Sequence, residues 1–359
     1  MAQKEQMSKR ERLKATLNGK PVDRPAFLFW GHNYDAEYSL ASHVSSVLWW
    51  QRYLDMDILK VQNRASYHGE GWGLRFEYPP VKPFVGIDYG YMPPNPPVAK
   101  PEYKQLAINK PEDWTKLKKL NPSEGALGER LLALKMILTG LKEMGEDVPV
   151  IETVFDPISV ASRMVGVEAG NRIDVLVDYL RKYPDEFHKG LEVITQTFKD
   201  YVHEALKVGI DGFLYATTFF ASQDVLTDVE YQEFGRPYGL RVLEPMQGSF
   251  VIFHVCHSSN MLFELKDYPV KIFSWATEDK TNPSLKEAKT KLPNHTLVGG
   301  LSKEALAADS PEIAINEAKK AYQDTKGLNW ICGPYCSVHP TYPVENMKAV
   351  GDYLKSLSD

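Results

Sequence analysis

The sequence contains little cysteine and lacks the segments that direct a chain into a membrane or out of the cell. Three cysteines among 359 residues do not make a disulfide framework, which favours a reducing compartment. Residues 1–14 are mixed and charged and have no apolar core, so they do not read as a signal peptide. No apolar run approaches the roughly 20 residues of a membrane-spanning helix. We therefore expect a cytoplasmic protein that does not enter a membrane.

The sequence also lacks an excess of positive charge. It contains 42 Lys and Arg against 47 Asp and Glu, a net charge of −5, and no block of like charges. Nucleic-acid binding needs a basic stripe, so we expect no nucleic-acid partner. A chain of 359 residues can bury a large core without disulfides or metals. A bound metal would therefore serve chemistry rather than folding.

Apolar segments of strand length alternate with segments of helical period over most of the chain. The predicted strands are residues 26–30, 57–61, 148–154, 212–216, 250–256, 271–275, 296–299 and 329–332. The clearest predicted helices are residues 9–17, 174–183, 191–208 and 311–325. This alternation is typical of a parallel sheet covered by helices, and eight strands are the number of a closed (β/α)8 TIM barrel. We expect a single domain, residues 1–359, with an N-terminal helical extension and a long Pro/Gly-rich loop at residues 78–101.

An open, doubly wound sheet is the alternative that this alternation leaves. Such a sheet carries a glycine-rich turn after its first strand when it binds a dinucleotide. Gly69, Gly71 and Gly73 are spaced too tightly for that turn and do not open an obvious helix. The barrel is therefore the favoured interpretation.

His254 and Cys256 stand at the end of a predicted strand and indicate a metal site. Residues two apart in a strand point to the same face, and TIM-barrel enzymes keep their active sites at this end of the strands. An imidazole and a thiolate that converge there make half of a zinc site. Cys336, just beyond the last predicted strand, is the candidate third ligand, whereas Cys332 lies inside that strand and is expected in the core. Buried His and Cys are also common without a metal, and Cys332 and Cys336 could instead form a redox pair.

Three segments resemble the uroporphyrinogen decarboxylase-like superfamily. They are Asn-Gly-Lys-Pro-Val-Asp-Arg-Pro at residues 18–25, residues 230–238 with Glu-Tyr-Gln-Glu-Phe and Pro-Tyr, and Pro-Thr-Tyr-Pro-Val-Glu-Asn-Met at residues 340–347. The resemblance extends over nearly the whole chain. It implies the TIM-barrel fold.

The sequence departs from the decarboxylases of that superfamily at three places. It has no arginine between Arg24 and Arg52, where the decarboxylases carry an arginine-rich stretch for their polyanionic substrate. The segment at residues 213–219 lacks their aspartate, and Cys336 stands where they have a histidine. Loss of several cationic anchors argues against porphyrinogen decarboxylation, since we find no replacement for them in the sequence.

The sequence is more similar to the zinc-dependent cobamide methyltransferases of the superfamily. Their His-x-Cys and Pro-x-Cys motifs match residues 254–256 and 334–336. The resemblance implies Zn²⁺ held by His254, Cys256 and Cys336, with a fourth position open for a substrate. It implies transfer of a methyl group between a corrinoid and a small molecule, in the first place a thiol, in a direction that the sequence leaves open. The corrinoid (cobalamin) would come from a partner protein, because the chain has no Asp-x-His-x-x-Gly segment. A decarboxylase-like lyase and a non-catalytic binding barrel are the alternatives.

Further polar residues near predicted strand ends are weaker candidates for a catalytic role. Glu152 could supply a fourth metal ligand or an acid–base group, or simply make a buried hydrogen bond. His32 and Asn33 could line the mouth of the barrel, or be ordinary loop residues.

Overall fold

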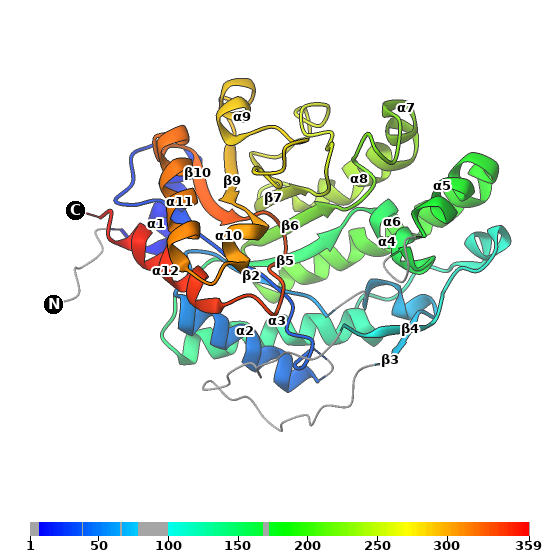
Figure 1. Ribbon diagram of the computed structural model, residues 1–359. Coiled ribbons are helices and arrows are strands. Elements are labelled where there is room, and N and C mark those ends of the chain that lie inside the picture. The colour runs from blue at the N-terminus through cyan, green and yellow to red at the C-terminus, as the bar shows by residue number, and fades with distance from the viewer. Residues whose placement is uncertain (1–6, 38, 65–66, 78–99, 168–171, 359) are drawn as a thin grey trace.

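The computed structural model describes residues 7–37, 39–64, 67–77, 100–167 and 172–358. It contains eight parallel strands in the order β1-β10-β9-β8-β7-β6-β5-β2, with helices around them (Figure 1). The strands are β1 Ala26–Phe27, β2 Leu59–Val61, β5 Val150–Phe155, β6 Gly212–Thr217, β7 Phe250–Val255, β8 Ile272–Ser274, β9 Thr296–Leu301 and β10 Trp330–Pro334. Each overlaps one of the eight segments predicted to be strands. The prediction of a TIM barrel is confirmed.

The helices lie outside the sheet, and most of them stand between successive strands in the chain. They are α1 Lys9–Leu17, α2 Leu40–Leu54, α3 Gly125–Glu143, α4 Pro157–Met164, α5 Ile173–Lys182, α6 Pro184–Val208, α7 Asp228–Glu230, α8 Arg236–Leu243, α9 Leu285–Lys291, α10 Lys303–Ala307, α11 Pro311–Thr325 and α12 Val344–Lys355. Short 3₁₀ segments are η1 Tyr67–Trp72, η2 Pro111–Lys116 and η5 Glu244–Met246, and Tyr231–Gly235 forms a π-helical turn.

Helix starts follow the capping chemistry of the sequence. Ser8 and Glu11 form a capping box at the first turn of α1. The Ser310 side chain accepts from the Glu312 amide at the start of α11, where Pro311 occupies the first turn. These side chains satisfy amide groups that a helix N-terminus leaves without partners.

Two features lie beside the barrel. β3 Arg75–Glu77 and β4 Glu102–Gln105 form a small antiparallel pair apart from the eight-stranded sheet. Most of the loop predicted at residues 78–101 lies outside the described residues. No helix among the described residues is long and apolar enough to cross a membrane.

The barrel has an apolar interior that is separate from the layer between strands and helices. The inward cluster takes one or more residues from each strand or the segment beside it, among them Leu28, Ile58, Ile151, Leu214, Ile252, Ile272, Val298 and Ile331. Alternate strand residues, such as Phe27 and Phe253, belong to the larger outer cluster with the helices. This alternation follows from the two-residue period of a strand.

A buried network around Asp57 joins the two ends of the strand order. The Asp57 carboxylate accepts from Arg12 of α1 at 2.7 Å, from Arg24 at 2.7 Å and from the Phe27 amide of β1 at 3.0 Å. The Asp57 amide, two residues before β2, donates to the Phe27 carbonyl at 3.1 Å. Side chains of Asp57, Arg12 and Arg24 in these ion pairs are fully buried. The network therefore fixes β1 beside β2, where the barrel closes.

We expect Asp57→Ala to lower the free energy of unfolding by about 3–5 kcal/mol, because it leaves two buried guanidinium groups without the carboxylate they share. Urea denaturation followed by circular dichroism measures the change. The control is Asp178→Ala, which removes an exposed ion pair with Lys182 and should change stability by less than about 1 kcal/mol. Equal effects of the two substitutions would contradict the assigned role of Asp57.

Candidate metal centre

Three potential ligands from distant parts of the chain meet at the end of the barrel strands. His254 lies in β7, Cys256 follows β7, and Cys336 follows β10. One ligand atom from each lies within 4.8 Å of the others, and the two Sγ atoms are 3.6 Å apart. Tetrahedral zinc with Zn–S bonds of about 2.3 Å would separate two thiolate sulfurs by about 3.8 Å. The donor set and its spacing therefore fit a zinc ion.

The His254 ring is already oriented for a ligand role. Its Nδ1 lies 3.0 Å from Oγ of Ser274, the residue that pairs with it across β7 and β8. Its Nε2 is buried and has no hydrogen-bond partner among the described residues. A proton on Nδ1 that is donated to Ser274 leaves the Nε2 lone pair for a metal, which is how outer hydrogen bonds fix metal-binding histidines.

The two thiols of the site lie within hydrogen-bond distance of each other. The hydrogen bond from Cys256 lowers the pKa of the Cys336 thiol well below its usual value, and nearby His254 lowers it further. The same hydrogen bond, together with burial, raises the pKa of Cys256. The pair is therefore arranged to present a thiolate, the form that binds metals.

The third cysteine does not belong to the site. Cys332 is fully buried in the outer cluster between strands and helices. Its neighbour Ile331 points into the barrel, so Cys332 lies on the opposite face of β10. Burial raises the pKa of its thiol, which keeps it protonated. The prediction that Cys332 is a core residue is confirmed.

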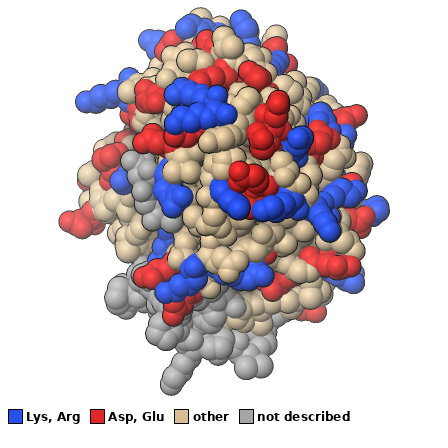
Figure 2. Space-filling view, turned by 90° about the vertical axis from the view of Figure 1, so that its right-hand side faces the viewer, with Lys and Arg blue, Asp and Glu red and all other residues tan. Residues whose placement is uncertain are grey.

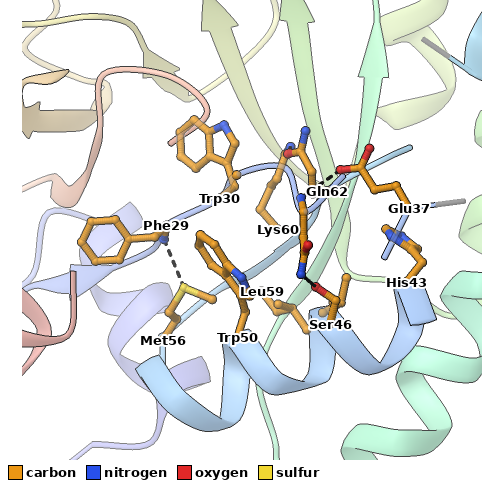
Figure 3. A pocket seen from close by; sticks show the side chains of 13 residues that line it. Phe29, Trp30, Glu37, His43, Ser46, Trp50, Met56, Leu59, Lys60 and Gln62 are labelled. Carbon is orange, nitrogen blue, oxygen red and sulfur yellow. Dashed lines mark hydrogen bonds between the residues drawn. The ribbon is translucent and has the colours of Figure 1, made fainter. Parts of the chain in front are cut away.

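The three candidate ligands line a cavity of about 270 Å³ at the mouth of the barrel. Its wall is partly apolar, with side chains that include Trp30, Phe155, Leu214 and Phe219. A second hollow of about 20 Å³ lies between β1, β2 and α2 (Figure 3). Of these two, the larger cavity has room for a small substrate.

His32 and Asn33 are adjacent in sequence but have different surroundings. His32 lines the mouth cavity and lies 2.7 Å from Glu37 through Nδ1 and 2.9 Å from the Gln62 amide through Nε2. Asn33 lines the smaller hollow instead, where its amide donates to Ser46 of α2 at 3.0 Å. The structure thus brings His32 to the cavity and turns Asn33 away from it.

Glu152 lies on the opposite face of β5 from the cavity. Its neighbour Ile151 faces the barrel interior, so Glu152 faces the helices and is fully buried. Arg130 donates to both carboxylate oxygens at 2.8 and 2.6 Å, and the Tyr201 hydroxyl donates at 3.0 Å. A role as fourth ligand or acid–base group does not fit this placement. The interaction is structural.

Cationic side chains that the sequence did not single out also line the cavity. Lys60 comes from β2, Arg163 from α4, and Lys100 from just before β4. The Arg163 guanidinium lies 4.0 Å from the Phe155 ring centroid. The sequence showed no replacement for the cationic anchors of the decarboxylases, whereas the structure places these three basic side chains at the cavity. The sequence signal for Lys60 is a lysine that stands between apolar residues within a predicted strand, residues 57–61.

Comparison with known proteins identifies the family. Residues 8–357 match the uroporphyrinogen decarboxylase (URO-D) family. The chain belongs to this family. Methylcobamide:CoM methyltransferase MtaA of Methanosarcina barkeri is 25% identical over 211 residues, 58% of either chain. Uroporphyrinogen decarboxylase of Thermodesulfovibrio yellowstonii is 21% identical over 169 residues, 46% of this chain and 47% of that protein.

Solved structures share the fold over a greater length. A methyltransferase from Methanosarcina mazei superposes with a TM-score of 0.77 at 20% identity, over 98% of this chain and 99% of that one. A B12-independent methionine synthase from Shewanella sp. W3-18-1 gives 0.54 at 10% identity, over 93% and 94%. The alignments with the curated relatives span about half of their length, so family membership by itself leaves the reaction of this chain open.

We expect wild-type protein supplied with zinc to hold about one zinc ion per chain, and His254→Ala and Cys336→Ala to lose most of it, since each removes one of three ligands. Elemental mass spectrometry of the purified proteins measures this content. Cys332→Ala is the matched control, because it removes a thiol on the other face of β10 and should retain zinc. Equal zinc in all four proteins would contradict the site.

We expect Glu152→Gln to lower the free energy of unfolding by about 3–5 kcal/mol, because Arg130 would stay buried without its counter-charge. The zinc content of the folded fraction should equal that of the wild type. Denaturation curves and metal analysis on the same samples separate the two effects. If Glu152→Gln lost zinc without losing stability, Glu152 would have to be assigned as a metal ligand.

Proposed function

We propose that this protein is a zinc-dependent methyltransferase that moves a methyl group between the corrinoid of a partner protein and a small thiol. The observation that carries the proposal is the convergence of His254, Cys256 and Cys336 on one point beside a cavity. Three protein ligands leave a fourth position for a substrate, as catalytic zinc sites require. Zinc bound there would lower the pKa of a substrate thiol and keep it as a nucleophilic thiolate.

The surrounding residues would position the reactants. Ser274 holds the His254 ring in one orientation, and the Trp30 ring meets its edge with centroids 6.0 Å apart. Apolar side chains such as Leu214 and Phe219 would exclude water from the thiolate and strengthen its interactions. A methyl donor must then approach through the mouth, since the apolar cluster of the barrel fills the other end.

A separate corrinoid protein is the proposed partner at this mouth. The chain has no segment typical of a cobalamin-binding domain, and two relatives are named methylcobamide:CoM methyltransferases. Methyl transfer from the corrinoid to the thiol and the reverse direction would use the same site. The proposal covers both.

Two other functions would use the cavity differently. A decarboxylase-like lyase is supported by one relative's name and by the basic side chains Lys60, Lys100 and Arg163 in the cavity, but it gives no role to the two sulfurs. A non-catalytic binding barrel needs no metal with an open position. The donor set therefore favours the methyltransferase.

We expect zinc-loaded protein to transfer the methyl group of methylcobalamin to 2-mercaptoethanesulfonate, as followed by the absorbance change of the corrinoid. Cys256→Ala should lower the rate by about 100-fold or more, because losing a ligand costs more than the roughly 10–100-fold effect of losing an outer partner. Cys332→Ala, the control, should keep the wild-type rate. Removal of zinc with a chelator should abolish transfer, and added zinc should restore it.

Transfer that proceeds equally in metal-free protein would overturn the zinc mechanism. Decarboxylation of uroporphyrinogen by the same preparation would establish the lyase instead. If free methylcobalamin does not react, a purified corrinoid protein in its methylated form replaces it. Absence of transfer from both donors to a panel of small thiols would overturn the proposal.

A further inference from the structure

Lys60 is a buried lysine that faces the proposed reaction site. In β2 it alternates with Leu59 and Val61, which pack outward, and so it points into the barrel above Ile58. Only 4% of its surface is exposed, and it lines the mouth cavity together with the three potential ligands. Figure 3 shows it between Trp30 and Gln62. No role in folding is evident for an amine at this place, because the strand would be as well packed by an apolar residue.

A chain of hydrogen bonds with one consistent direction holds the Lys60 amine. The amine donates to the side-chain oxygen Oε1 of Gln62. The side-chain nitrogen Nε2 of Gln62 lies 2.9 Å from Nε2 of His32. Nδ1 of His32 lies 2.7 Å from the Glu37 carboxylate. Because an amide nitrogen only donates, His32 must accept at Nε2 and donate from Nδ1. This tautomer of His32 is neutral, and the chain ends at the acceptor Glu37.

The Lys60 amine has no carboxylate partner within ion-pair distance in the described part of the chain, and its other contact is the Trp30 ring, 5.8 Å away at the centroid. Four charged groups act on it from the surrounding elements: Glu152 of β5, Arg130 of α3, Cys336 after β10, and Glu37 before α2. Burial outweighs the carboxylates and the thiolate and lowers the pKa of Lys60 to about 7. A lysine held in this way can gain or lose a proton near neutral pH, as a general base requires.

We propose that Lys60 accepts the proton that a thiol loses when it binds beside His254, Cys256 and Cys336. This inference rests on the proposed function, because it concerns the same thiol. The S–H bond breaks, its electron pair stays on sulfur, and the proton forms a new N–H bond with the free amine of Lys60. The resulting ammonium keeps its hydrogen bond to Gln62. After methyl transfer, loss of the proton to solvent restores the amine.

The charge inside the cavity supports this route for the proton. Two thiolates and a neutral imidazole balance the two positive charges of a zinc ion, so the loaded site carries no net charge. A third thiolate would add one negative charge to a buried cavity, which is costly without a counter-charge. A proton retained on Lys60 leaves the net charge of the cavity unchanged. Gln62 would act as a positioning residue that keeps the amine near the bound sulfur.

The test is a proton inventory for binding of 2-mercaptoethanol to zinc-loaded protein. Titration calorimetry in buffers of different ionisation enthalpy gives the number of protons released to solvent, about one unit below and one unit above the pKa of Lys60. At the pH below this pKa, Lys60 already carries a proton, so thiol binding to the wild type should release about one proton to solvent. At the pH above this pKa, Lys60 should take up the thiol proton, and the release to solvent should fall close to none. Lys60→Met should release about one proton at both pH values. Lys289→Met, which removes a lysine that donates to the Leu328 carbonyl outside the cavity, should behave like the wild type.

The outcomes separate this inference from the proposed function. Thiol binding with about one proton released at both pH values in wild type would overturn the role of Lys60 and leave the methyltransferase standing. Zinc-loaded protein that binds no thiol would overturn both. If Lys60→Met does not fold, Gln62→Leu replaces it. Gln62→Leu removes the hydrogen bond that holds the Lys60 amine, so it should shift the midpoint pH of the change in proton release. An unchanged midpoint pH would contradict the positioning of Lys60 by Gln62.

Discussion

The structure depends on one buried carboxylate. Asp57 joins Arg12 of α1, Arg24 before β1, and the backbone of Phe27 in β1, and it stands two residues before β2. Buried charges of this kind are stable only when each has a partner, so the three groups order one another. The N-terminal helix, the first strand and the second strand thereby take fixed places. Because β1 and β2 are the two ends of the strand order, this contact holds together the two strands at which the barrel closes.

Strand alternation and register then decide which side chains can take part in chemistry. Ile252 and Ile272 pair across β7 and β8 in the apolar interior, and two residues further His254 and Ser274 pair in the same way. The hydrogen bond that orients the imidazole is therefore a direct result of sheet register. The same rule places Lys60 two residues beyond Ile58 on the inner face. An apolar layer closes the barrel, and a polar layer above it forms the site.

The sequence predicted those site residues whose placement does not depend on which face of a strand points into the barrel. His254 and Cys256 share a face in either case, and the segment beyond the last strand could be located for Cys336. Glu152 was assigned to the mouth because it stands near a strand end. Its strand is apolar on both faces, as strands of a parallel sheet usually are, so the sequence cannot show which residues point inward. Packing against α3 and α6 decides this, through the contacts with Arg130 and Tyr201.

The role proposed for Lys60 gives the candidate metal site a proton acceptor in addition to its candidate ligands. A closed apolar barrel and a partly apolar wall surround the cavity, so a charge created there is poorly solvated. A thiol that loses its proton to bulk water would leave such a charge behind, whereas a nearby amine retains the proton and the electrical balance. Burial lowers the pKa of Lys60 to about 7, so the amine is available for this step at neutral pH. The same desolvation that makes a thiolate reactive therefore also prepares its proton acceptor.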